Sequence, residues 1–102
     1  MAVMLVIMEF TYYPYDEKFV EKVDERWGVY TLADRSKRVV FIGRGNVKKH
    51  LFEHLPDGKS PAEEAEFFQV EYFKDKSEAQ SAWLEQVEAY KKKHGGLPKY
   101  NG

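Results

Sequence analysis

The sequence predicts an α+β domain in which a small, mostly antiparallel three-stranded sheet is flanked by helices. Short runs rich in Val, Ile, Tyr and Phe, typical of strands, alternate with segments whose apolar residues recur at helical spacing. The polar run Asp34-Arg35-Ser36-Lys37 lies between two such strands and indicates a hairpin turn. The chain has 102 residues, of which 43% are hydrophobic, so it can bury one core and is not a disordered sequence.

The first 26 residues look like an extension that precedes this domain. Ala2–Tyr13 is rich in Val, Met and aromatic residues, which favours an extended segment that Pro14 ends. Asp16 is a candidate cap for a short helix over Glu17–Arg26. We therefore expect a strand and a short helix over residues 1–26, followed by the domain proper over residues 27–102.

The centre of the sequence predicts a hairpin followed by a helix. Gly28–Ala33 and Arg38–Gly43 are the two strands on either side of the polar turn. Asn46 is a plausible cap for a helix over Val47–Leu55, whose apolar residues recur every four positions.

The remaining sequence predicts a third strand and a long helix. Pro56–Pro61 is a loop, and Phe67–Phe73 is the strand. Ser77 is a candidate cap for a helix that continues to about Lys93, and Gly95-Gly96 ends it. The side chains expected to face the sheet from this helix are Ala79, Ala82, Trp83, Val87 and Tyr90.

Composition narrows the classes of function. The chain has no cysteine, which excludes a disulfide framework, a thiolate metal site and a cysteine nucleophile. The apolar start is too short to span a bilayer and lacks the features of a leader, so we expect no membrane association and a cytoplasmic protein. The formal net charge of −1 argues against nucleic-acid binding over the whole surface, but a local basic patch can still bind DNA.

Several motifs occur in an order that points to one family. Two tripeptides lie on the predicted hairpin strands, a basic residue follows the second, and a basic helix then opens with Asn. A later helix begins Ser-Glu-Ala and carries a glutamate eight residues after its Ser. The matching stretches are Gly28-Val29-Tyr30, Phe41-Ile42-Gly43, Arg44, Asn46–His50, Ser77-Glu78-Ala79 with Glu85, and the tail Pro98-Lys99-Tyr100-Asn101. Because of the order and spacing of these motifs, residues 27–101 resemble the GIY-YIG nuclease family.

The resemblance implies a metal-dependent DNA endonuclease on a GIY-YIG-like fold. It implies that Glu85 holds one divalent ion, Mg²⁺ or Mn²⁺, that Tyr30 helps to activate water, and that Arg44 contacts phosphate. His50 occupies the position of the arginine that the family carries on its helix, once a one-residue deletion is allowed. Phe41 stands where the second tripeptide has a tyrosine, and it has no hydroxyl.

A basic rim is the feature that DNA would need. The cations expected to form it are Arg44, Lys48, Lys49, Lys91, Lys92, Lys93 and Lys99, and Asn46 is expected to bind nucleic acid beside them. The alternative for Lys91 is an ordinary cationic end of a helix. Likewise, Tyr30 could simply pack in a strand and Glu85 could be a solvated helix residue. His50 and His54, four residues apart, have a spacing seen in metal sites, but two residues bordering the core is the preferred interpretation.

Three functions remain open from the sequence. The first is a metal-dependent endonuclease acting on structured or damaged DNA. The second is a degenerate relative that binds nucleic acid without cutting it, which Phe41 and His50 favour. The third is a protein-interaction module, in which the apolar strand Ala2–Phe10 pairs with a partner or with a second copy to form a homodimer.

Overall fold

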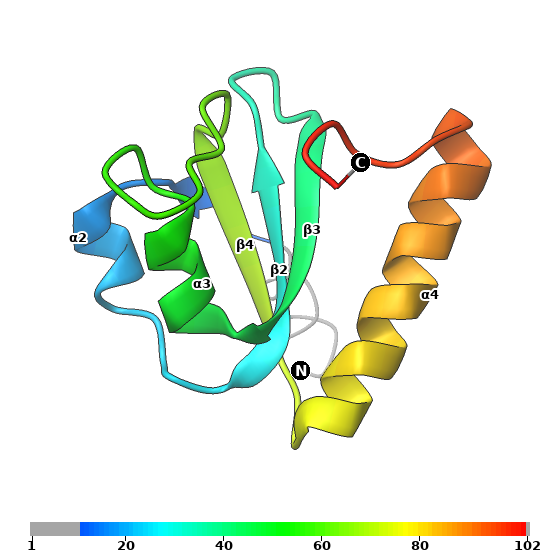
Figure 1. The fold of residues 1–102 in the computed structure, drawn as a ribbon, viewed down its shortest axis with the longest axis horizontal. Helices are drawn as coiled ribbons and strands as arrows, with labels where there is room; N and C mark the ends of the chain where they lie inside the picture. The colour runs from blue at the N-terminus through cyan, green and yellow to red at the C-terminus, as the bar shows by residue number, and fades with distance from the viewer. Residues whose placement is uncertain (1–10, 102) are drawn as a thin grey trace.

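A computed structural model of the chain describes residues 11–101 (Figure 1). The elements in chain order are β1 (Tyr13–Pro14), α2 (Glu17–Val20), β2 (Trp27–Ala33), β3 (Val39–Asn46), α3 (Val47–Glu53), β4 (Phe67–Tyr72) and α4 (Lys76–His94). The α+β class predicted from the sequence is confirmed. The strand expected over Ala2–Phe10 lies outside the described residues, so the homodimer that depends on it stays a prediction. No helix in residues 11–101 is long and apolar enough to cross a membrane.

The sheet has four strands in the order β1-β4-β2-β3, and every neighbouring pair is antiparallel. The prediction of three strands missed β1, and Pro14 is the last residue of that strand. Pro14 lies in β1 opposite Phe67. A proline is tolerated there because β1 forms an edge of the sheet, where one side of the strand needs no amide donor.

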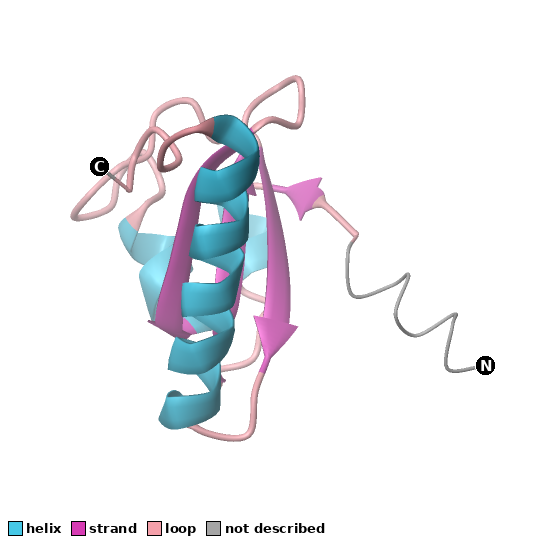
Figure 2. Ribbon diagram, turned by 90° about the vertical axis from the view of Figure 1, so that its right-hand side faces the viewer, coloured by secondary structure: helices cyan, strands magenta, loops and turns pink. Residues whose placement is uncertain are grey.

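Helices cover the two faces of the sheet unequally. The short helices α2 and α3 lie on one face, and α4 runs across the other (Figures 1 and 2). The first face buries the larger core, whose members include Tyr30, Leu32 and Phe68 of the sheet, with Val20 from α2 and Leu51 from α3. Because Val20 has no exposed surface, α2 contributes to the same core as the residues after position 26.

The helix predicted over Glu17–Arg26 is shorter in the structure. Asp16 does cap it, accepting a hydrogen bond from the Phe19 amide at 3.1 Å. The helix ends at Val20, and the amides of Lys22 and Val23 bond three residues back instead of four, which tightens the chain into a turn. After this turn the chain continues to Trp27, where β2 begins.

The long helix α4 begins two residues earlier than the prediction. Asp75, and not Ser77, caps it by accepting a hydrogen bond from the Glu78 amide at 2.9 Å. Gly95 ends it with φ 77°, a left-handed conformation that favours glycine. The five side chains predicted to face the sheet are all buried or half-buried, with Ala79 and Val87 the deepest.

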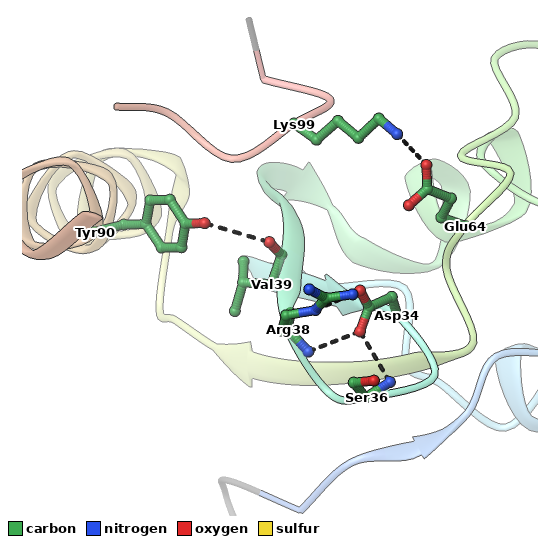
Figure 3. Close-up of polar contacts among 7 residues, drawn as sticks. All are labelled: Asp34, Ser36, Arg38, Val39, Glu64, Tyr90 and Lys99. Atoms are coloured by element: carbon green, nitrogen blue, oxygen red, sulfur yellow. Dashed lines mark hydrogen bonds and ion pairs between the residues drawn. The ribbon is translucent and has the colours of Figure 1, made fainter. Parts of the chain in front are cut away.

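The segment after α4 returns to β3 and is held there by polar contacts. The Tyr100 amide donates to the Val40 carbonyl at 2.8 Å. The Asn101 side chain accepts from the Ile42 amide and donates to the Ile42 carbonyl, both at 2.9 Å. Figure 3 shows two further contacts of this region, Lys99 with Glu64 and the Tyr90 hydroxyl with the Val39 carbonyl. These contacts fix the tail beside the strand that carries the second tripeptide.

Candidate functional site: an open cleft beside strand β3

A cleft of about 550 Å³ opens beside β3. Residues of β2, β3, α3, the loop after α3, α4 and the tail line it. Its polar side chains include Arg44, His50, Glu53, His54, Lys59 and Ser60. The cleft thus lies where the two motif strands meet the helix that opens with Asn46.

Gly43 leaves room for the Tyr30 ring beside the cleft. It lies directly opposite Tyr30 in the antiparallel pair of β2 and β3. A Cβ atom at position 43 would come within 2.2 Å of Tyr30 Cζ and 2.3 Å of its hydroxyl oxygen. The glycine therefore lets the Tyr30 ring lie across β3 and reach toward α3.

The Tyr30 hydroxyl meets His54 at the floor of this cleft. The hydroxyl oxygen lies 3.1 Å from His54 Nε2, and His54 Nδ1 lies 2.8 Å from the Ser60 carbonyl oxygen. A carbonyl can only accept, so Nδ1 carries the ring proton and donates it. In the neutral ring Nε2 is then the acceptor, and the Tyr30 hydroxyl donates to it.

Tyr30 itself is deeply buried, with 2% of its surface exposed. Burial is the main cause that raises the pKa of Tyr30 above its ordinary value of 10.0, and the nearby Glu53 charge adds to it. The phenol is therefore neutral at physiological pH. It can act as a hydrogen-bond donor, and it needs a partner such as His54 to take its proton.

His50 lies above the same ring. It stacks on Tyr30 with the ring centroids 6.2 Å apart, and its Nδ1 donates to Glu53 Oε1 at 2.9 Å. Its Nε2 lies over Gly45, whose φ of 124° and missing side chain leave room for the imidazole. The hydrogen bond from His50 lowers the pKa of Glu53 below its ordinary value. Glu53, the carboxylate of this cleft, is thus already bound to an imidazole.

Arg44 presents its charge at the rim of the cleft. Its guanidinium carbon lies 4.7 Å from the centre of the Trp83 ring. Trp83 is held in turn by its Nε1, which donates to the Ile42 carbonyl at 2.8 Å. Arg44 is exposed, and no carboxylate within residues 11–101 forms an ion pair with it. It can therefore receive an anion from solvent.

Glu85 lies away from this cleft. It is exposed on α4 and lines a separate groove together with Phe73, Ser77 and Ser81. The reason is helical geometry, because Trp83 faces the cleft and a residue two positions later points roughly 200° around the helix. The structure thus brings Tyr30, Arg44 and His50 together and leaves Glu85 outside. The role that the resemblance implies for Glu85 stays a prediction.

A divalent ion does not fit the cleft as it is arranged. Glu53 is engaged by His50, and the free lone pair of His54 accepts from Tyr30. Within residues 11–101 no group of three or more His, Asp or Glu side chains could hold a metal ion. The charged side chains of this cleft are the cations Arg44 and Lys59 and the carboxylate of Glu53, which His50 already engages.

The other predicted binding residues divide into two groups. Asn46 caps α3, accepting from the Lys49 amide at 3.2 Å, and Lys48 and Lys49 follow it at the start of that helix. Lys91 is exposed near the end of α4, and Lys99 is paired with Glu64. None of these five residues is among those that line the cleft.

Sequence reasoning missed several contributors to the cleft, among them Glu53 of α3. Lys59 and Ser60 lie in the loop between α3 and β4, and Trp83 was expected only as a core residue of α4. The four-residue spacing of His50 and His54 was the available signal that both imidazoles face one side of α3.

Comparisons with known proteins identify a matching family and a solved structure of similar fold. A family described as "Domain of unknown function (DUF7508)" matches residues 8–90. No curated protein matches the chain. Among solved structures, the chain is similar to the GIY-YIG N-terminal endonuclease domain of UvrC from Thermotoga maritima, bound to its catalytic divalent cation, magnesium. The TM-score is 0.65 and the identity 22%, covering 83% of this chain and 93% of that one. This likeness confirms a GIY-YIG-like fold.

Proposed function

This chain belongs to the family described as Domain of unknown function (DUF7508), and we propose that its GIY-YIG-like fold binds the phosphate backbone of DNA in the cleft beside β3. The observation that carries the proposal is the charge arrangement of the cleft. Arg44 and Lys59 line it, and its carboxylate, Glu53, is already bound to His50. Phosphate contacts by such cations supply most of the affinity in non-specific nucleic-acid binding.

Arg44 is the main phosphate contact in this proposal. A guanidinium is always charged and can grip two phosphate oxygens with parallel hydrogen bonds. The Trp83 ring holds Arg44 at the rim without neutralising it. Lys48 and Lys49 extend the positive surface along the first turn of α3, next to the cleft. The acidic loop residues Glu63 and Glu64 do not line the cleft.

A metal-dependent DNA endonuclease is the second candidate, and the Tyr30–His54 contact favours it. A phenol that donates to the Nε2 of a neutral imidazole can take a proton from attacking water as it passes its own proton to that nitrogen. The resemblance assigns Mg²⁺ or Mn²⁺ to Glu85. We place binding first because Glu85 lies outside the cleft and because Phe41, which lines it, has no hydroxyl.

One set of assays separates the two candidates. Labelled single-stranded, duplex and branched DNA is incubated with the protein in EDTA, and binding is measured by anisotropy. We expect binding that Arg44→Ala weakens by about tenfold, the loss of one charge-assisted contact. Arg35→Ala is the matched control, because Arg35 is an exposed arginine in the turn at the other end of the hairpin.

Cleavage is measured on the same DNA with Mg²⁺ or Mn²⁺, using wild type and Glu85→Ala. Intact DNA in both samples, together with binding in EDTA, supports the binding module. Metal-dependent cutting that Glu85→Ala abolishes would establish the endonuclease instead. If none of the DNA molecules binds, the proposed function is wrong.

A further inference from the structure

Resting on the proposed function, we infer that the preferred ligand is single-stranded DNA, with Trp27 and Trp83 as surfaces on which bases stack beside Arg44. A single strand offers both phosphates and open base faces, whereas a duplex hides the faces of its bases in the helix. Proteins that bind single strands combine a cationic groove with aromatic side chains for this reason. The inference therefore requires aromatic rings and cations that alternate along one exposed path.

Trp27 is the exposed ring of this path. It is the first residue of β2 and keeps 41% of its surface accessible. Tryptophan is enriched at interfaces because its ring offers a large apolar area and an N–H donor. Lys76 Nζ lies 5.9 Å from the centre of the ring, so a cation stands beside it. The acids nearest in the chain to Lys76, Asp75 and Glu78, both accept backbone hydrogen bonds at the start of α4.

Trp83 is the ring at the cleft end of the path. It lines the cleft, and the hydrogen bond from its Nε1 to the Ile42 carbonyl fixes the indole. Arg44 lies over it, so one side of the guanidinium contacts an aromatic face. A base and its phosphate need the same pair of neighbours, a flat ring and a cation.

The strand register connects the two ends. Val29 pairs with Arg44, and Trp27 pairs with Asn46. Because side chains alternate along a strand, Trp27 and Arg44 are diagonal neighbours on the face covered by α4, typically about 7–8 Å apart. The order from the cleft outward is then Trp83, Arg44, Trp27 and Lys76. This alternation of rings and cations continues the phosphate-binding cleft.

The test uses tryptophan fluorescence, because Trp27 and Trp83 are the two tryptophans of the chain. Trp83→Phe leaves Trp27 as the reporter, and Trp27→Phe leaves Trp83. Each protein is titrated with oligodeoxythymidylate and with a duplex of the same length at one fixed salt concentration. We expect oligodeoxythymidylate to quench both reporters and to bind about tenfold more tightly than the duplex, as one stacked base provides.

The matched pair of variants is Trp27→Ala and Tyr13→Ala. Both remove an exposed aromatic side chain, but Tyr13 lies in β1, at the opposite edge of the sheet from β3. We expect Trp27→Ala to weaken oligodeoxythymidylate binding about tenfold with little change for the duplex, and Tyr13→Ala to change neither. Equal affinity for the two ligands with no quenching would overturn the stacking inference while leaving backbone binding intact. If neither ligand binds, the proposed function itself fails.

Discussion

The Tyr30 hydroxyl lies 3.1 Å from His54 Nε2, which accepts a hydrogen bond from it when the ring is neutral, because Nδ1 donates to the Ser60 carbonyl. This contact joins β2 to the end of α3, across 24 positions of sequence, inside a cleft that also holds Arg44 and His50. The Tyr30 ring belongs to the larger core and also lines the cleft, so one side chain takes part in both.

We expect Tyr30→Phe to lower the free energy of unfolding by about 1 kcal/mol, since it leaves His54 Nε2 without its donor. Combined with His54→Phe in a double-mutant cycle, the two changes should be less than additive by a similar amount. Urea unfolding measures both quantities. Tyr90→Phe is the control with a much smaller expected effect, because its hydroxyl lies 3.5 Å from the Val39 carbonyl. Strict additivity would show that the Tyr30–His54 contact contributes nothing.

Stability should fall in alkaline solution because of the buried phenols. Burial raises the pKa of Tyr30 above its ordinary value of 10.0, and the same is true of Tyr15. Their contribution is therefore complete below pH 10.0 and is lost as pH rises toward the folded-state pKa values. The slope per tyrosine is about 1.4 kcal/mol for each pH unit. Tyr30→Phe should make the unfolding free energy less steep between about pH 10 and 11.5, measured by urea unfolding. An unchanged slope would contradict this assignment.

Gly43→Ala should destabilise the domain by about 1–3 kcal/mol, because the new methyl group would overlap the Tyr30 ring and Phe41. Gly96→Ala is the control, since no atom lies within 4 Å of a Cβ atom at that position. Its effect should stay within about 0.5 kcal/mol. Urea midpoints compare the two variants, and equal midpoints would show that Tyr30 can leave the space opposite Gly43 at little cost.

Charge reversal at the start of α3 should reduce the salt dependence of DNA binding. If Lys48 and Lys49 each neutralise one phosphate, the double variant Lys48→Glu, Lys49→Glu lowers the log–log salt slope by about 1.4 for a single strand. Affinity is measured at several salt concentrations. Lys22→Ala, an exposed cation just after α2, is expected to keep the wild-type slope. A slope that the double variant leaves unchanged would place the DNA elsewhere on the surface.

The sequence predicted the hairpin, the two longer helices and the third strand, because their periodicities are local and strong. It did not predict β1, since a two-residue strand containing Pro14 has no pattern of its own and exists only through its pairing with β4. The helix predicted over Glu17–Arg26 was too long, because the turn after Val20 depends on where β2 begins. Trp27, the residue after the predicted helix, is the exposed first residue of β2.

The sequence predicted the part of the candidate site that local motifs define, and it missed the part that depends on tertiary structure. Tyr30, Arg44 and His50 follow motifs that lie close together in the chain and meet in one cleft. The positions of Lys59 and Ser60 depend on the path of an irregular loop, which no periodicity describes. The direction of Glu85 follows from the stripe of α4, since Trp83 and Val87 define the sheet-facing side and Glu85 lies off it.

The C-terminal tail has a consequence for association between molecules. β3 is an outer strand of the sheet, and the outward backbone groups of such a strand normally invite pairing with another chain. Here Tyr100 occupies the Val40 carbonyl and Asn101 occupies both backbone groups of Ile42. A foreign strand can join the sheet at these positions only by displacing the tail. The tail therefore hinders ordered aggregation of molecules through the outer edge of β3.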